Sequence, residues 1–254
     1  CREVYVIVGR RRPGRKQLLR AFPDRRSPEP PQPEVRVYLD LGSPWSFLGF
    51  TQLGRIFAGR CRVVVVPILV GIVFREVGTP NLPSAALSET KRRYAADDLQ
   101  RWAAFWGEPC TMPSFFPLRS VLPCRVCIIE PRAMGALFRA VWQQNKNVGE
   151  AAILCDVLNG AGFPGERLVN RAATDPHVKK QLAENTATAL QRGVIGVPTY
   201  EVADKPSASS LLLFGQDRTD QLLDILAGWQ PSPPNAAQQR ALNKLQLFAH
   251  SSRL

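Results

Sequence analysis

Hydrophobic and polar residues alternate most regularly along residues 35–41, and this period of two predicts a β-strand. Ser43 and Pro44 follow directly. A proline suits the first position of a helix, because the N–H that it lacks would have no partner there. We therefore expect the strand to run into a helix with Ser43 as the N-cap or just outside it. The apolar members of the alternation are Val35, Val37, Leu39 and Leu41.

A second pattern lies far downstream, where residues 193–200 and 211–218 read as loop, strand, turn, strand and helix start. Pro198 cannot donate to a central ladder, so we expect it at the first residue of a strand or in a sharp turn, where a cis peptide becomes possible. The backbone groups of Val197 would then remain free to meet a peptide-like ligand. An ordinary β-hairpin followed by a helix cap is the alternative.

Between these two patterns, residues 71 to about 185 carry apolar residues at spacings of three and four, which predicts an all-helical segment. We expect this segment to cover the active site. The longest apolar run, residues 63–74, is interrupted by Pro67 and is shorter than the roughly 18 residues that a membrane helix needs. We therefore expect a soluble protein that does not bind a membrane. The predicted helices are 94–105, 134–143, 150–159 and 176–190.

The two predicted helix starts matter chemically, because a helix N-terminus carries free amides and about half a positive charge. A hydroxyl at Ser43 would add a hydrogen-bond donor beside an anion held there. Residues 215–218 open the second helix and offer a second anion site. The competing interpretation of Ser43 is plain capping, since serine is among the commonest N-cap residues.

The formal net charge of +12 is concentrated at one end of the chain. Residues 1–33 hold nine basic and three acidic residues, which is +6, and five of their last eleven residues are prolines. The rest of the chain lacks the interleaved basic and aromatic residues of a nucleic-acid-binding surface, so we expect no nucleic-acid partner.

The basic extension at residues 1–33 resembles a mitochondrial transit peptide followed by a linker, and we expect it to lie outside the fold. Ser252-Arg253-Leu254 is a near variant of the peroxisomal Ser-Lys-Leu signal, so we expect a mitochondrial or peroxisomal location, and otherwise a cytoplasmic one.

Cysteine and histidine limit the possible chemistry. Cys124 and Cys127 have CxxC spacing, which could indicate dithiol redox chemistry, but their apolar neighbours favour the core of a helix. His177 and His250 are the two histidines, and neither has an evident catalytic partner. We therefore expect neither a Ser-His-Asp hydrolase nor a His-rich zinc site, and no metal.

The ordered motifs resemble a known family. They are the strand with Ser43-Pro44-Trp45-Ser46, the turn Gly196-Val197-Pro198-Thr199, and the helix start Phe214-Gly215-Gln216-Asp217-Arg218. In this order they are similar to 2-hydroxychromene-2-carboxylate isomerases and kappa-class glutathione transferases, on the DsbA-like branch of the thioredoxin superfamily. The similarity covers about residues 34–230 and includes the stretches 71–80, 91–99, 112–119 and 173–179.

The resemblance implies an α/β protein with a thioredoxin-like fold that is interrupted by an all-helical insertion. The thioredoxin-like domain would comprise 34–70 and 186–230, with the insertion at 71–185 and a tail at 231–254. It also implies glutathione as the cofactor, a small aromatic or electrophilic substrate, and a homodimer. Thioredoxin-type oxidoreductases carry a CxxC at the strand-to-helix turn, where this chain has Ser43 and Ser46, so no active-site disulfide can form there.

By the same resemblance, Ser43 faces the glutathione sulfur, with Pro44 and Trp45 beside it. Val197 pairs its backbone with the cysteinyl part of glutathione, Pro198 fixes the turn, and the γ-glutamyl end meets Gln216, Asp217 and Arg218.

Lys91 matches a lysine of the family that lies near the glycyl carboxylate, although Lys91-Arg92-Arg93 is equally consistent with a solvated helix face. Where the family has glycine then asparagine, this chain has Gly78-Thr79-Pro80-Asn81, so Thr79 or a shifted Asn81 would take that place. Trp45 and Phe74 would wall an aromatic substrate pocket or belong to the core.

The function implied is a glutathione-dependent isomerase of the 2-hydroxychromene-2-carboxylate type. A serine without an adjacent base is a poor nucleophile, but its hydroxyl can stabilise a thiolate at a helix N-terminus. The alternatives are a kappa-type transferase that conjugates electrophiles, a thioredoxin-fold module that binds partners without catalysis, and a dithiol oxidoreductase that uses Cys124 and Cys127.

Overall fold

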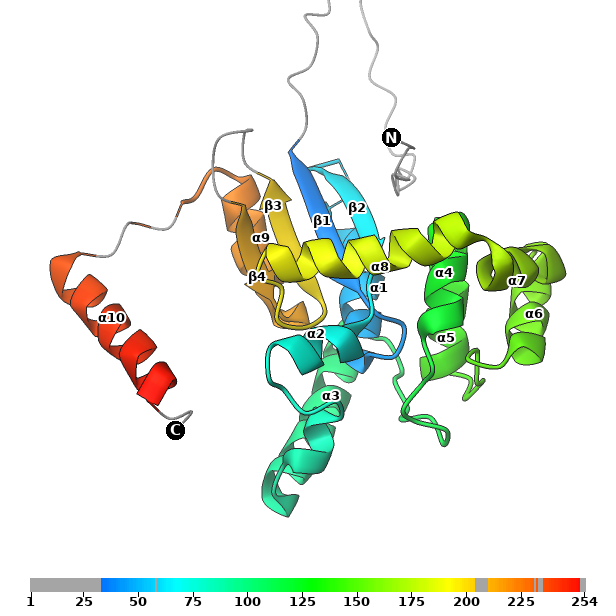
Figure 1. Cartoon of the computed structure of the whole chain (residues 1–254), viewed down its shortest axis with the longest axis horizontal. Coiled ribbons are helices and arrows are strands. Elements are labelled where there is room, and N and C mark those ends of the chain that lie inside the picture. Colours follow the sequence, from blue (N-terminus) through cyan, green and yellow to red (C-terminus); the bar gives the residue numbers. More distant parts are fainter. Residues whose placement is uncertain (1–32, 58, 204–209, 231, 233–234, 252–254) are drawn as a thin grey trace, which may run out of the picture.

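The computed structural model describes residues 33–57, 59–203, 210–230, 232 and 235–251 (Figure 1). A mixed sheet lies at the centre of the described residues, with helices on both of its faces. The expectations for the basic extension, except for residue 33, and for Ser252-Arg253-Leu254 lie outside the described residues.

The sheet has four strands in the order β2-β1-β3-β4. The alternating segment forms β1, which pairs in parallel with β2 and antiparallel with β3; β3 pairs antiparallel with β4. The parallel pair is connected by α1, Pro44–Phe57, because parallel neighbours need a crossover. The strands are β1 Glu34–Leu39, β2 Arg62–Pro67, β3 Thr199–Ala203 and β4 Leu211–Phe214.

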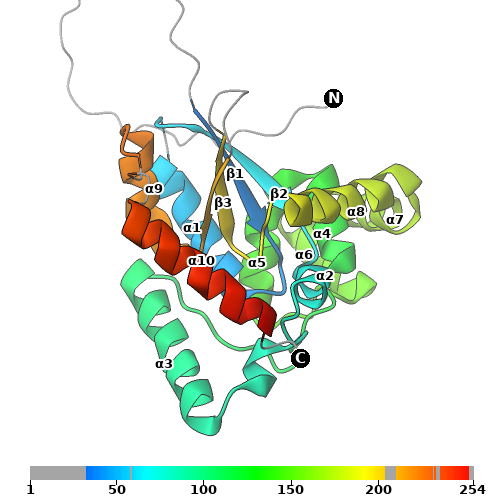
Figure 2. The same cartoon turned by 60° about the vertical axis from the view of Figure 1, so that its left-hand side comes forward.

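The period of two along β1 separates two hydrophobic cores. Val35 and Val37 are fully buried in the core that includes α1, whereas Tyr38 belongs to the core formed with α2, Val70–Glu76, and α8, Pro176–Gln191. Figures 1 and 2 accordingly show α8 across one face of the sheet and α1 on the other.

The long segment between β2 and β3 is helical, and all four helices predicted there are confirmed to within a few residues at each end. Helix α7 was not predicted, although Cys124 and Cys127 lie in α4 as expected. Helices α4 to α7 group beside the sheet, while α3 extends beyond the carboxyl end of β1 (Figure 1). The elements of this segment, besides α2 and α8, are η1 Pro83–Ala86, α3 Glu89–Trp106, α4 Val121–Ile129, η2 Pro131–Ala133, α5 Met134–Trp142, α6 Ala151–Gly160 and α7 Gly165–Thr174.

After β4 the chain makes one 3-10 turn, η3, Gln216–Arg218, before α9, Thr219–Leu226, so the helix expected to open at Gln216 begins with a tighter turn. Helix α10, Ala236–Ser251, follows. None of the helices in the described part of the chain is long and apolar enough to span a membrane. The division into a thioredoxin-like domain and an inserted helical domain stays a prediction.

Candidate functional site

A cavity of about 220 Å³ lies where four separate segments meet. The first turn of α1, the turn before β3, the β4–η3 junction and α3 each contribute a wall, so residues more than 100 positions apart in the sequence face one space. Its lining residues are Trp45, Asp98, Trp102, Val197, Phe214, Gly215, Gln216 and Asp217.

The first turn of α1 begins as the sequence predicted, with Ser43 as its N-cap. The Ser43 Oγ accepts the N–H of Ser46 at 3.2 Å, and the Ser43 carbonyl accepts the N–H of Phe47 at 3.1 Å. Ser43 is 9% exposed and does not itself line the cavity; Trp45, two residues later, does. Within the described residues, neither the Ser43 hydroxyl proton nor the backbone N–H of Trp45 has a hydrogen-bond acceptor. Both donors therefore remain available at the positive end of this helix.

The turn before β3 contains a cis peptide bond between Val197 and Pro198, in the place where the sequence made one possible. The Pro198 carbonyl accepts the N–H of Gly215 at 2.9 Å, which ties the turn to the end of β4. The backbone N–H and C=O of Val197 form no hydrogen bond with the described residues, as predicted. Unpaired backbone groups are costly to bury without a partner, so this edge is suited to a peptide-like ligand.

Helix α1 lies directly against this turn because Gly49 has no side chain. A Cβ at Gly49 would lie 2.9 Å from the Tyr200 Oη and 3.0 Å from the Pro198 Cγ. Tyr200 is fully buried, and burial, together with the charge of Asp217, raises the pKa of its hydroxyl. The Tyr200 Oη has no hydrogen-bond partner in the described structure.

The β4–η3 junction supplies a polar wall. The Gln216 Oε1 accepts the Trp106 Nε1–H at 2.6 Å, which leaves the Gln216 amide N–H₂ as its free donor. The Asp217 carboxylate also lines the cavity, whereas Arg218 is an exposed neighbour with its Nη1 3.8 Å from the Asp217 Oδ2. Gly215 has a φ of 115°, and a Cβ there would lie 2.4 Å from the Asp217 Oδ1, so this corner requires glycine.

Helix α3 forms the fourth wall through Asp98 and Trp102, two residues that were not predicted as part of the site. Asp98 and Trp102 are one turn apart on α3 and face the cavity together. Trp102 stacks on Trp106 with ring centroids 5.8 Å apart, so the aromatic wall is held by its own helix. The four-residue spacing of Asp98 and Trp102 was visible in the sequence, but the direction in which α3 faces was not.

Two predicted ligand-binding residues lie away from the cavity lining. Asn81 is exposed, and its Oδ1 approaches α2 so closely that a Cβ at Gly71 would be 2.8 Å from it. Lys91 is exposed in the first turn of α3, where its N–H lies 3.5 Å from the Ser88 Oγ. The cavity thus brings together Trp45, Val197, Gln216 and Asp217, with Ser43, Pro44 and Pro198 adjacent in the chain.

Cys124 and Cys127 are buried in α4, at 1% exposure each, as the core interpretation predicted. Burial raises the pKa of both thiols, and the charge of Asp40 raises the pKa of Cys124 further. Since the thiolate is the reactive form, these residues are poorly suited to dithiol exchange. The described residues contain no group of three or more histidine, cysteine, aspartate or glutamate side chains that could hold a metal ion.

Comparison with known proteins agrees with this architecture. The DSBA-like thioredoxin domain model matches residues 34–227. The chain belongs to the DsbA-like thioredoxin family. It is 25% identical to glutathione S-transferase kappa 1 of Caenorhabditis elegans over 84% of this chain and 99% of that protein. It is 28% identical to 2-hydroxychromene-2-carboxylate isomerase of Pseudomonas putida over 72% of this chain and 89% of that protein.

Among solved structures, a 2-hydroxychromene-2-carboxylate isomerase superimposes with a TM-score of 0.65 at 23% identity, covering 76% of this chain and 94% of that structure. This likeness establishes the fold. The curated relatives from the worm and the bacterium are both enzymes, and they carry the names of the two families that the sequence motifs resemble.

Proposed function

We propose that this protein is a glutathione-dependent isomerase in which Ser43 stabilises the thiolate of the bound tripeptide. The observation that carries the proposal is that Val197, whose backbone groups are unpaired among the described residues, and Trp45, in the first turn of α1 beside Ser43, line one cavity. Glutathione combines a thiol, a peptide backbone and an α-ammonium group. The cavity surroundings offer a matching partner for each.

The sulfur is assigned to the start of α1. The Ser43 hydroxyl and the Trp45 N–H donate to the anion, and the helix dipole favours its negative charge. Ser43 needs no general base in this role, because it donates a hydrogen bond and does not attack. When bound there, glutathione would supply a thiolate nucleophile for reversible addition to an unsaturated carbon of the substrate, so that the thiol is not consumed.

The rest of the tripeptide is assigned to the opposite walls. The backbone of Val197, which precedes β3 and is unpaired among the described residues, pairs with the cysteinyl residue. The carboxylates of Asp217 and Asp98 attract the α-ammonium group. Trp45 and Trp102 form an apolar wall that favours an aromatic substrate.

A Ser43→Ala variant tests the role of the hydroxyl. Removing one donor from a developing anion is expected to lower kcat by about 10²- to 10³-fold. Loss of the cap also costs about 1 kcal/mol of folding free energy, so rates are compared at a temperature where both proteins are folded. Ser43→Thr, which keeps the hydroxyl and the cap, is the matched control. Equal rates for Ser43→Ala and the unmodified protein would reduce Ser43 to a helix cap.

A kappa-type transferase is the second candidate, favoured by the alignment that spans 99% of the worm transferase. The two outcomes differ in the fate of the thiol. With a chromene carboxylate as substrate, an isomerase leaves the total glutathione unchanged, whereas with an electrophile a transferase forms one conjugate per glutathione lost. Calorimetric titration with glutathione alone separates both from a non-catalytic module, because a module of that kind gives no saturable binding.

A further inference from the structure

Asp40 is a buried carboxylate immediately after β1 and three residues before Ser43. It is 2% exposed, and burial raises its pKa. Burying an ionisable group without partners is expensive, so its partners indicate what it does.

Both carboxylate oxygens accept backbone N–H groups at the bases of two helices. The Oδ1 accepts the N–H of Gly42 at 2.8 Å, and the Oδ2 accepts the N–H of Val70 at 2.8 Å. Val70 is the first residue of α2, whose own N-cap Leu69 provides no side-chain bond. Asp40 therefore links the turn that carries Ser43 to the start of α2.

The backbone of Asp40 holds the same turn from the other side. Its carbonyl accepts the N–H of Ser43 at 3.1 Å, and its N–H donates to the Ser46 Oγ at 3.3 Å. On α4, the Cys124 Sγ lies 3.9 Å from the Asp40 Oδ1. The hydroxyl of Ser120, the N-cap residue of α4, offsets part of the effect of burial by lowering the pKa of Asp40. Among the described residues, the titratable group that contacts the Asp40 carboxylate is the Cys124 thiol.

We infer that Asp40 is a positioning residue, which fixes the turn at Gly42 and thereby directs the Ser43 hydroxyl toward the bound sulfur. This inference rests on the proposed role of Ser43. A carboxylate suits the task because its two oxygens accept two N–H groups at once. An asparagine offers one oxygen, and its N–H₂ would face a backbone donor, so the turn and the start of α2 could no longer both be held.

Asp40→Asn is the test, with Thr186→Val as the matched control. Thr186 is buried, and its Oγ1 accepts the N–H of Leu69 at 3.1 Å, so the control loosens the start of α2 without touching the Ser43 turn. Amide hydrogen exchange in the ligand-free protein is expected to accelerate at residues 42, 43, 45 and 46 in Asp40→Asn and not in Thr186→Val. Ser120→Ala, a milder change to the same carboxylate, serves if Asp40→Asn does not fold.

The second readout is the ultraviolet absorbance of the glutathione thiolate bound to each protein, followed against pH. In Asp40→Asn the midpoint of thiolate formation is expected to move upward and kcat to fall by about 10- to 100-fold, with KM for glutathione little changed. An unchanged midpoint, or the same change in Thr186→Val, would overturn the inference. If the unmodified protein binds no glutathione thiolate, the proposed function fails instead, which keeps the two failures apart.

Discussion

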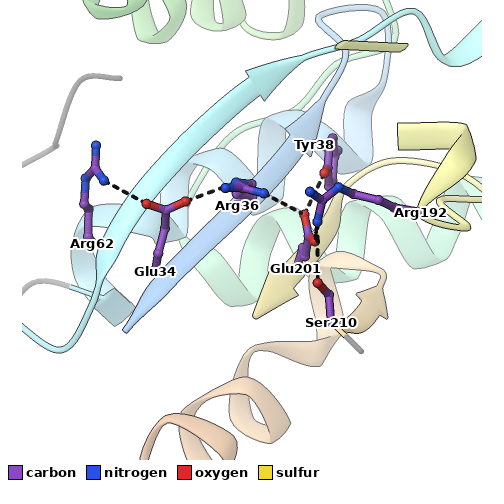
Figure 3. Close-up of polar contacts among 7 residues, drawn as sticks. All are labelled: Glu34, Arg36, Tyr38, Arg62, Arg192, Glu201 and Ser210. Atoms are coloured by element: carbon purple, nitrogen blue, oxygen red, sulfur yellow. Dashed lines mark hydrogen bonds and ion pairs between the residues drawn. The ribbon is translucent and has the colours of Figure 1, made fainter. Parts of the chain in front are cut away.

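Two tyrosine hydroxyls are buried on opposite faces of the sheet, and they differ in whether they form a hydrogen bond. The Tyr38 Oη donates to the Glu201 Oε2 at 2.7 Å, whereas the Tyr200 Oη has no partner within the described residues. Figure 3 shows Glu201 at the centre of a chain of polar contacts that also includes Arg36 and Arg192. Burial raises the pKa of Glu201, but hydrogen bonds from Tyr38 and Ser210 and the charge of Arg192 outweigh it, and the pKa stays below its usual range.

Tyr38→Phe and Tyr200→Phe should therefore affect stability differently. Removing a hydrogen bond to a charged group costs about 1.5–3 kcal/mol, so urea denaturation is expected to show that loss for Tyr38→Phe. Tyr200→Phe removes an unsatisfied hydroxyl and should be neutral or stabilising.

The effect of Tyr38→Phe should depend on pH with a definite sign. Because the folded-state pKa of Glu201 is lowered, the stabilisation of its ionised form is present above the unfolded-state pKa, about 4.3, and is lost as the pH falls through the folded-state value. The difference between the unmodified protein and Tyr38→Phe should shrink in acid. A difference that grows in acid would contradict this account.

At the scale of elements, the distance between α1 and the cis-Pro198 turn is set by Gly49. An added Cβ would press on the Tyr200 Oη at 2.9 Å and on the proline ring at 3.0 Å. The same helix contains Gly54, where a Cβ would meet nothing within 4 Å. These two glycines give a comparison within one helix.

Gly49→Ala is expected to destabilise the protein by about 1–3 kcal/mol through overpacking. Gly54→Ala is expected to stabilise it by about 0.5–1 kcal/mol, because alanine has the higher helix propensity. Thermal denaturation measures both effects. Gly49→Ala should also raise the Kd for glutathione, since it separates the donors of α1 from the Val197 edge; an unchanged Kd would show that this distance does not matter for binding.

The sequence was informative about these elements wherever a local pattern determined them. Alternation along 35–41 predicted β1, and serine followed by proline predicted the start of α1. Which residues of α3 face the cavity could not be predicted in this way. Asp98 and Trp102 reach the cavity because α3 packs beside α1, and that packing depends on the path of the whole chain. For the same reason, Lys91 lies on the exposed part of α3 and Asn81 beside α2, away from the cavity lining.

At the scale of the molecule, the cavity connects segments that are remote in sequence. Residues 45, 98, 197 and 217 lie in four different parts of the chain, and each lines the same space. A ligand that bridges these segments stabilises the folded state as a whole, because it binds the folded chain and has no equivalent site in the unfolded one. The expected gain is about 2.7 kcal/mol at a ligand concentration 100 times Kd.

Glutathione should therefore protect separate segments from hydrogen exchange at the same ligand concentration. We expect slower exchange around residues 45, 197 and 215–218, segments that contribute residues to the cavity lining, and in α3 near Trp102. Helices α6 and α7 lie on the far side of α4 and α5 and provide the internal control, because no cavity-lining residue belongs to them. Ophthalmic acid, which has a methyl group in place of the thiol, should protect the Val197 and 215–218 segments but bind less tightly, since the donors at Ser43 and Trp45 would face no sulfur. Equal affinity for the two tripeptides would remove the start of α1 from the proposed site, and protection confined to one segment would mean that the cavity does not bind glutathione as a unit.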